Sequence, residues 1–155
     1  MRAAMASLLM LGALAGCDEK LPVVGVDGGA DAQPQLPAIL LSHDDPPIGS
    51  ALNHRVVRAS RDVAVRLEPR WGELQPRIMT IAPDNRARLG EELRKGMPPG
   101  WTAEPVEGLA PDGAQLYAFS LGKAFFGALV VDPQGAPVIP VVILRNRALL
   151  DRVKG

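Results

Sequence analysis

The C-terminal half of the chain shows the clearest alternation of apolar segments and turn residues. Four apolar segments predict strands at residues 101–109, 114–121, 124–131 and 136–144. Residues 110–113 and 132–135 each have Pro in the second position and Gly in the fourth, as type I turns prefer. Gly122-Lys123 suits a two-residue hairpin loop. These short connections predict an antiparallel meander, with Pro105 and Pro140 in its outer strands.

A helix is predicted before the meander, at residues 83–95. Pro83 suits the first turn of a helix, and Asp84 lies at the positive end of the helix dipole. Glu91 and Lys95 have the i,i+4 spacing of an ion pair, and the Gly that follows the helix is placed to cap its C-terminus. A second, shorter helix is expected at residues 146–154, with Asn146 as its N-cap.

Alternation with period two also predicts strands between residues 55 and 81. Residues 63–68 alternate apolar and polar side chains, residues 55–59 are a plausible partner strand, and residues 77–81 form a third strand. The pattern as a whole predicts an α+β fold. We expect a small antiparallel meander packed with one helix and preceded by a β-hairpin.

Residues 17–50 have the composition of a flexible linker, because prolines, glycines and acidic residues interrupt every apolar period. The run at residues 37–41 is the one part of this linker that has the composition of a strand. We therefore expect a single folded domain at residues 51–155, separated from the start of the chain by about 30 residues of linker.

The first residues have the pattern of an export signal. Arg2 precedes an apolar run over residues 3–15, which is too short for a bilayer-spanning helix of roughly 20 residues. The run ends in Leu14-Ala15-Gly16-Cys17, which resembles the lipobox of bacterial membrane lipoproteins. The resemblance implies that residues 1–16 are removed and that Cys17 carries a diacylglyceryl thioether and a further acyl chain such as palmitate. An ordinary secretory signal, with Cys17 incidental, is the alternative.

The lipoprotein resemblance also implies a location, which is the cell envelope on the periplasmic side of a membrane. In enteric-type bacteria, an Asp directly after the lipidated Cys is associated with retention in the inner membrane. Asp18 occupies that position. We therefore expect the inner membrane in preference to the outer one, with the lipid bilayer as one partner and an unknown envelope protein as another.

The charge balance narrows the classes of partner. Lys and Arg number 17 and Asp and Glu also number 17, so no bulk polyanion such as nucleic acid is expected as a partner. Positive charge is nevertheless concentrated in one stretch, at Arg55, Arg58, Arg61, Arg66 and Arg70. These residues could form a face for anionic lipid or cell-wall polymer. The alternative is that nearby acids, Asp62, Glu68 and Glu73, neutralise them on an ordinary solvated surface.

The sequence has few groups suited to catalysis or metal binding. It contains no Gly-Xaa-Ser-Xaa-Gly elbow and no phosphate-binding Gly-rich loop, and only His43 and His54 could act as the base of a triad. His43, Asp44 and Asp45, with His54 nearby, are the densest potential metal ligands, but they have no fixed motif spacing. We expect no enzyme activity, no metal and no cofactor, although a hydrolase with an unrecognised site remains an alternative.

Gly100-Trp101 follows the predicted helix, Tyr117-Ala118-Phe119 lies in a predicted strand, and residues 131–135 form a predicted turn. With these motifs, residues 83–144 resemble a PepSY domain. PepSY domains are small envelope modules that are often thought to modulate peptidases without being enzymes. The chain departs from the pattern at residues 125–128, which are more apolar than expected. The expected function is that of a non-catalytic envelope lipoprotein that interacts with another envelope component.

Overall fold

The computed structural model of the protein describes residues 33–42 and 49–152. Its five strands form one antiparallel sheet in the order β1-β5-β4-β3-β2. The strands are β1 Leu74–Ile81, β2 Thr102–Ala103, β3 Ala114–Leu121, β4 Ala124–Val131 and β5 Ile139–Asn146. The helices are α1 Ser50–Trp71, the 3₁₀ helix η1 Pro83–Arg88, α2 Leu89–Lys95 and α3 Arg147–Asp151. The predicted α+β fold with an antiparallel sheet is confirmed.

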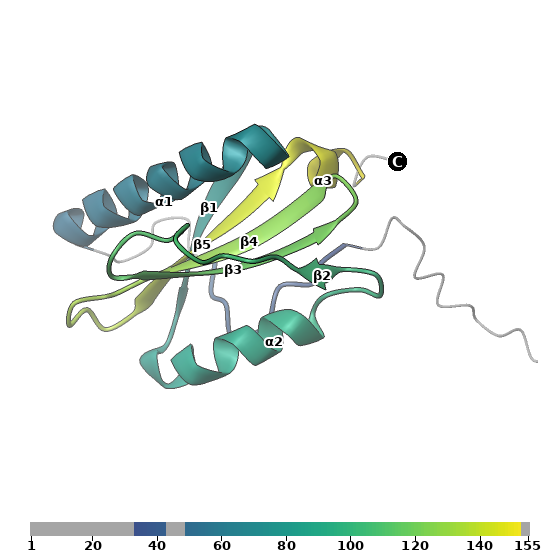
Figure 1. Ribbon diagram of the computed structural model, residues 1–155. Coiled ribbons are helices and arrows are strands. Elements are labelled where there is room, and N and C mark those ends of the chain that lie inside the picture. Colours follow the sequence, from purple (N-terminus) through teal and green to yellow (C-terminus); the bar gives the residue numbers. More distant parts are fainter. Residues whose placement is uncertain (1–32, 43–48, 153–155) are drawn as a thin grey trace, which may run out of the picture.

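Helices cover both faces of the sheet (Figure 1). The helix α1 packs on one face, and η1 and α2 pack on the other. β4 lies in the middle and is buried along its whole length, with Phe125 and Leu129 on the α1 side and Phe126 and Val130 on the α2 side. A strand that is buried on both faces has no solvent-facing positions, which explains why residues 125–128 are more apolar than expected.

The hairpin predicted at residues 55–68 is wrong, because this stretch belongs to α1. Its buried apolar side chains recur every three or four residues. They are Leu52, Val56, Ala59, Val63 and Leu67. This spacing places them on one stripe of a helix, where all five pack against the sheet. In the described part of the chain, no helix is both long enough and apolar enough to cross a membrane.

The predicted meander is correct in its centre and differs at its edges. β3 and β4 have the predicted bounds, and Gly122 and Lys123 form the loop between them. β2 is two residues long, because the chain leaves the sheet at Pro105 after one further hydrogen bond from Glu104 N to Ala118 O (2.9 Å). The two proline turns close one residue later than predicted, so that Ala114 N donates to Pro111 O and Ala136 N to Pro133 O.

Pro140 does not lie in an edge strand, contrary to the prediction, because β1 pairs with the outer side of β5. The β1–β5 ladder places Pro140 opposite Thr80. The β4–β5 ladder ends at the pair of Val130 and Val141, one residue before Pro140 would join it. The missing N–H of Pro140 therefore falls where pairing with β4 has already stopped.

The two predicted helices are present with adjusted bounds. Residues 83–95 form η1 followed by α2, and Lys95 Nζ lies 2.8 Å from Glu91 Oε1 as the spacing predicted. The hydrogen bond from Lys95 lowers the pKa of Glu91, and its bonds to Glu91 and Glu92 raise the pKa of Lys95. At α3, the Asn146 side chain accepts a hydrogen bond from Leu149 N, so the predicted N-cap is confirmed.

Part of the segment predicted to be a linker packs against the domain. Gln35 N donates to Gly96 O at 2.8 Å, and Leu41 pairs with Thr80 at the free edge of β1. Leu40 is buried in the core on the α2 side. Residues 33–42 therefore contribute to the core, before the first helix begins. The strand-like run at residues 37–41 makes this one bridge, at Leu41.

Candidate functional site

The five arginines predicted to form one basic face are divided by the structure. Arg66 donates hydrogen bonds from Nη1 to Gly108 O (3.0 Å) and Leu109 O (3.2 Å). Arg70 forms an ion pair with Glu104 at 2.9 Å. Both side chains therefore hold the segment between β2 and β3 against α1. Arg70 is paired with a carboxylate, whereas Arg66 binds neutral carbonyls and keeps its charge.

Arg55 and Arg58 line a cavity at the opposite end of α1. This cavity has a volume of about 260 Å³ and lies between the helix and the turn at residues 111–114. Asp62 and Asp112 also line it, but no ion pair joins either Arg to a carboxylate of the described residues. The predicted neutralisation by Asp62, Glu68 and Glu73 is therefore not found among residues 49–152.

Arg61 is exposed on α1 and lines neither this cavity nor the two that are described below. The predicted basic face thus consists of two arginines at a cavity, one exposed arginine and two that bind the fold itself. The five arginines therefore differ in their contacts, and a basic face on α1 stays a prediction.

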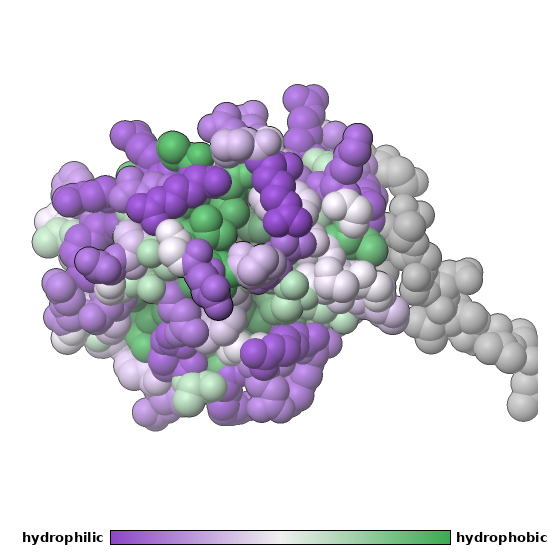
Figure 2. All heavy atoms as spheres, in the orientation of Figure 1, coloured by the Kyte–Doolittle hydropathy of each residue, from purple (hydrophilic) through white to green (hydrophobic). Residues whose placement is uncertain are grey.

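An apolar crevice of about 160 Å³ lies between α1 and the segment that joins β2 to β3. Its apolar lining includes Leu67, Trp71, Leu109, Ala118 and Phe125. The rings of Trp71 and Phe125 pack with their centroids 5.1 Å apart. Figure 2 shows apolar surface in this region, crossed by polar side chains. The crevice is small, and the charged side chains at its border, Arg66, Arg70 and Glu104, already make hydrogen bonds or an ion pair within the fold.

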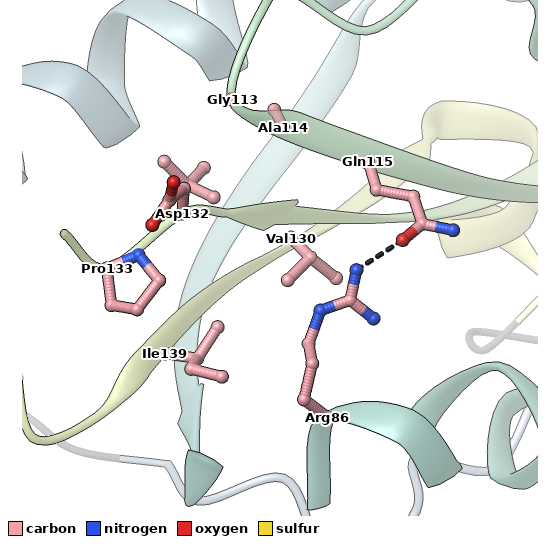
Figure 3. Close-up of a pocket in the computed structure, with 9 residues that line it drawn as sticks. Arg86, Gly113, Ala114, Gln115, Val130, Asp132, Pro133 and Ile139 are labelled. Atoms are coloured by element: carbon pink, nitrogen blue, oxygen red, sulfur yellow. Dashed lines mark hydrogen bonds between the residues drawn. The ribbon is translucent and has the colours of Figure 1, made fainter. Parts of the chain in front are cut away.

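A further cavity of about 400 Å³ lies on the other face of the sheet, where Arg86 reaches from η1 toward β3 (Figure 3). Arg86 donates hydrogen bonds to Gln115 Oε1 and to the Tyr117 hydroxyl, the latter at 3.2 Å. Gly90 allows the Tyr117 ring to lie against α2, because a Cβ at this position would be 2.8 Å from Tyr117 Cε1. The arrangement fixes the guanidinium of Arg86 at the wall of the cavity.

These three cavities contain no Ser, Cys or His among their lining residues. Ser42 accepts a hydrogen bond from Arg77, and Ser120 donates one to Glu104. His54 is exposed on α1. In the ranges that the structure describes, no three potential metal ligands converge. Cys17, Asp18, His43, Asp44 and Asp45 lie outside the described residues.

Comparison of the chain with protein-family models, with curated proteins and with solved structures gives no match. The resemblances to bacterial lipoproteins at residues 1–17 and to PepSY domains at residues 83–144 therefore stay predictions. The functional argument rests on the residues of this chain.

The sequence analysis assigned no role to Arg86, which lies in the predicted helix with Leu89 and Leu93, and it missed the cavity. The sequence could have pointed to Arg86, because it is a charged residue close to the helix face that carries these two buried leucines. Its two partners could not be identified in the same way, because Gln115 and Tyr117 lie 29 and 31 residues away along the chain.

Proposed function

We propose that this protein is a lipid-anchored envelope module that binds another envelope component and does not itself carry out a reaction. The lipobox-like residues that end in Cys17 support the anchor. The observation that carries the binding function is the pair of arginines at the α1 cavity. Arg55 and Arg58 line it without an ion-pair partner among the described residues.

A localised protein partner is favoured over a bulk anionic surface. Gly108, Leu109 and Glu104 hold Arg66 and Arg70 against the segment between β2 and β3, and the other three predicted arginines make no such contact in the described residues. The cavity beside Arg55 and Arg58 also contains Asp62 and Asp112. Such a mixture of charges suits a partner with matching groups, since electrostatic complementarity gives specificity. A uniform polyanion would meet repulsion from these acids.

The anchor is tested by replacing Cys17 with Ser. We expect the variant to leave the membrane fraction and to lose labelling by a fatty-acid probe, because the acylated thiol would be absent. Unchanged labelling would contradict the anchor. Inner-membrane retention through Asp18 is tested separately, by separating the two membranes on a density gradient. Equal recovery of Asp18→Ser and the parent protein in the outer membrane would show that Asp18 does not direct sorting.

The binding function is tested by photocrosslinking in intact cells. A crosslinking amino acid replaces Arg61, which is exposed on α1, and in a matched protein it replaces Arg94, which is exposed on α2. We expect position 61 to capture a defined envelope protein that position 94 does not capture, and Arg55→Ala with Arg58→Ala to reduce that capture. Crosslinks only to lipid or cell-wall polymer would favour the alternative, a module that binds an anionic surface.

A further inference from the structure

The guanidinium of Arg86 is held by neutral groups. Its Nη2 donates to Gln115 Oε1 and its Nη1 donates to the Tyr117 hydroxyl at 3.2 Å. No carboxylate among residues 33–42 and 49–152 forms an ion pair with it. A guanidinium has five N–H donors in a fixed planar arrangement. The two bonds therefore orient the group and leave both its charge and further donors for a ligand.

The cavity beside Arg86 combines this charge with an apolar wall. Val130, Pro133 and Ile139 line it, and its volume of about 400 Å³ lies within the range of small-molecule sites. Figure 3 shows the guanidinium beside Val130, with Asp132 and Pro133 on the other side of the cavity. Asp132 is held in its turn, where its Oδ1 accepts a hydrogen bond from Gln134 N at 2.9 Å.

The charges in the cavity restrict the ligand. A guanidinium matches the two oxygens of a carboxylate, and it binds them with charge-assisted hydrogen bonds. The acid at the far side, Asp132, disfavours a second negative group there. The apolar residues between them favour an uncharged hydrocarbon body. A single carboxylate attached to a short apolar group satisfies all three conditions.

We infer that this cavity binds a carboxylate that carries a short apolar body, supplied either by the C-terminus of a peptide or by a free carboxylic acid. The inference rests on the proposed function, because it gives the binding module a ligand class. Gln115 and Tyr117 act as positioning residues, since they fix Arg86 before the ligand arrives and so reduce the entropy lost on binding.

The test is a titration of the full-length, isotope-labelled protein in neutral-detergent micelles, followed by NMR. The probes are hexanoate, its uncharged analogue hexanamide, and the N-acetylated peptide Ala-Ala-Leu with either a free or an amidated C-terminus. We expect the amide signals of Gln115, Val130 and Ile139 to shift with the two carboxylates. The carboxylate probe that binds with the lower Kd, hexanoate or the peptide with a free C-terminus, identifies the source of the ligand. Equal shifts with the uncharged analogues, or no shift with either carboxylate, would overturn the proposal.

Two variants separate the role of Arg86 from its contribution to folding. Gln115→Glu places a carboxylate on the guanidinium and keeps the contact, so we expect carboxylate binding to weaken roughly tenfold to a hundredfold without loss of thermal stability. Arg86→Gln should weaken binding to a similar extent. The matched control is Arg88→Gln on the same 3₁₀ helix, because Arg88 is exposed and does not line the cavity. We expect this control to bind like the parent protein.

Unchanged binding in a folded Gln115→Glu protein would contradict the assignment. This outcome is distinct from failure of the proposed function, because the titration requires neither an acyl chain on Cys17 nor a partner at α1. Conversely, membrane release or loss of crosslinking at α1 would leave the titration of the Arg86 cavity unaffected.

Discussion

The two ends of the sheet differ in how their polar groups are satisfied. Where β5 meets α3, Asn146 is 2% exposed and accepts hydrogen bonds from Phe125 N and Leu149 N, at 2.9 and 3.1 Å. Its amide donates to Trp71 O and Lys123 O, at 3.0 and 2.8 Å. At the opposite end, three arginines line cavities without an acidic partner in the described ranges. They are Arg55, Arg58 and Arg86.

This difference indicates that the Asn146 side chain serves folding, whereas the three arginines at the opposite end are available for binding. A buried polar group with all its hydrogen bonds made inside the protein fixes the elements that it joins. Asn146 joins α1, the β3–β4 loop, β4 and α3 in this way. Cations that line cavities and lack an acidic partner retain the capacity to bind an anion. We therefore expect substitutions at the Asn146 end to affect stability and those at the other end to affect binding.

The largest effect is expected from Asn146→Ala. The substitution leaves Phe125 N and Leu149 N without their partner in a buried site, and it removes the donor to two part-buried carbonyls. Each unsatisfied buried group costs about 1–3 kcal/mol, so we expect the free energy of unfolding to fall by about 3 kcal/mol or more. Urea denaturation followed by circular dichroism measures this change.

The control for this substitution is Asn53→Ala, because Asn53 is exposed on α1. We expect its free energy of unfolding to stay within about 0.5 kcal/mol of the parent protein. Equal free energies of unfolding for the two variants would show that the buried Asn146 contributes no more to stability than the exposed Asn53 does.

A smaller effect is expected from Gly96→Ala, which tests whether residues 33–42 belong to the folded unit. A Cβ at Gly96 would lie 2.2 Å from Gln35 O, and a backbone atom at that distance must move. We expect a loss of about 1–3 kcal/mol in the free energy of unfolding. We also expect faster proteolysis within residues 33–42. Gly49→Ala is the control, because an added Cβ there has no neighbour within 4 Å.

The smallest effect distinguishes the arginines on α1 from one another. Arg66→Ala removes two hydrogen bonds to the carbonyls of Gly108 and Leu109, so we expect a loss of about 1 kcal/mol. Arg58→Ala should change the free energy of unfolding by less than about 0.5 kcal/mol, because no ion pair joins Arg58 to the described residues. Equal losses measured by urea denaturation would contradict the division of the basic face.

The error at α1 shows the limit of local patterns. Residues 63–68 alternate apolar and polar side chains, and valines favour strands, so a strand was a reasonable prediction. Val63, together with Val56 from the predicted partner strand, also belongs to a helical stripe that begins at Leu52 and ends at Leu67. A local window cannot decide between the two periods. Burial of the whole stripe against the sheet decides in favour of the helix.

The candidate sites were predictable to different degrees. Cys17 is predicted as a lipidation site from its neighbours in sequence alone, and it stays a prediction because it lies outside the described residues. The arginines on α1 were identified by composition, but Arg66 and Arg70 were found to bind loop groups that the sequence did not place nearby. The Arg86 cavity was not predicted, because composition does not show which residues of a helix contact which residues of a sheet.

The sequence by itself determined the elements whose signals are local. These are the β3–β4 hairpin, the helical region at residues 83–95 and the cap at Asn146, since turn geometry, helix capping and strand period depend on neighbouring residues. Only the tertiary structure decided that α1 is a helix, that residues 33–42 join the core and that Arg86 meets Gln115. Each of these outcomes depends on contacts between distant parts of the chain, which form only when the hydrophobic faces are buried together.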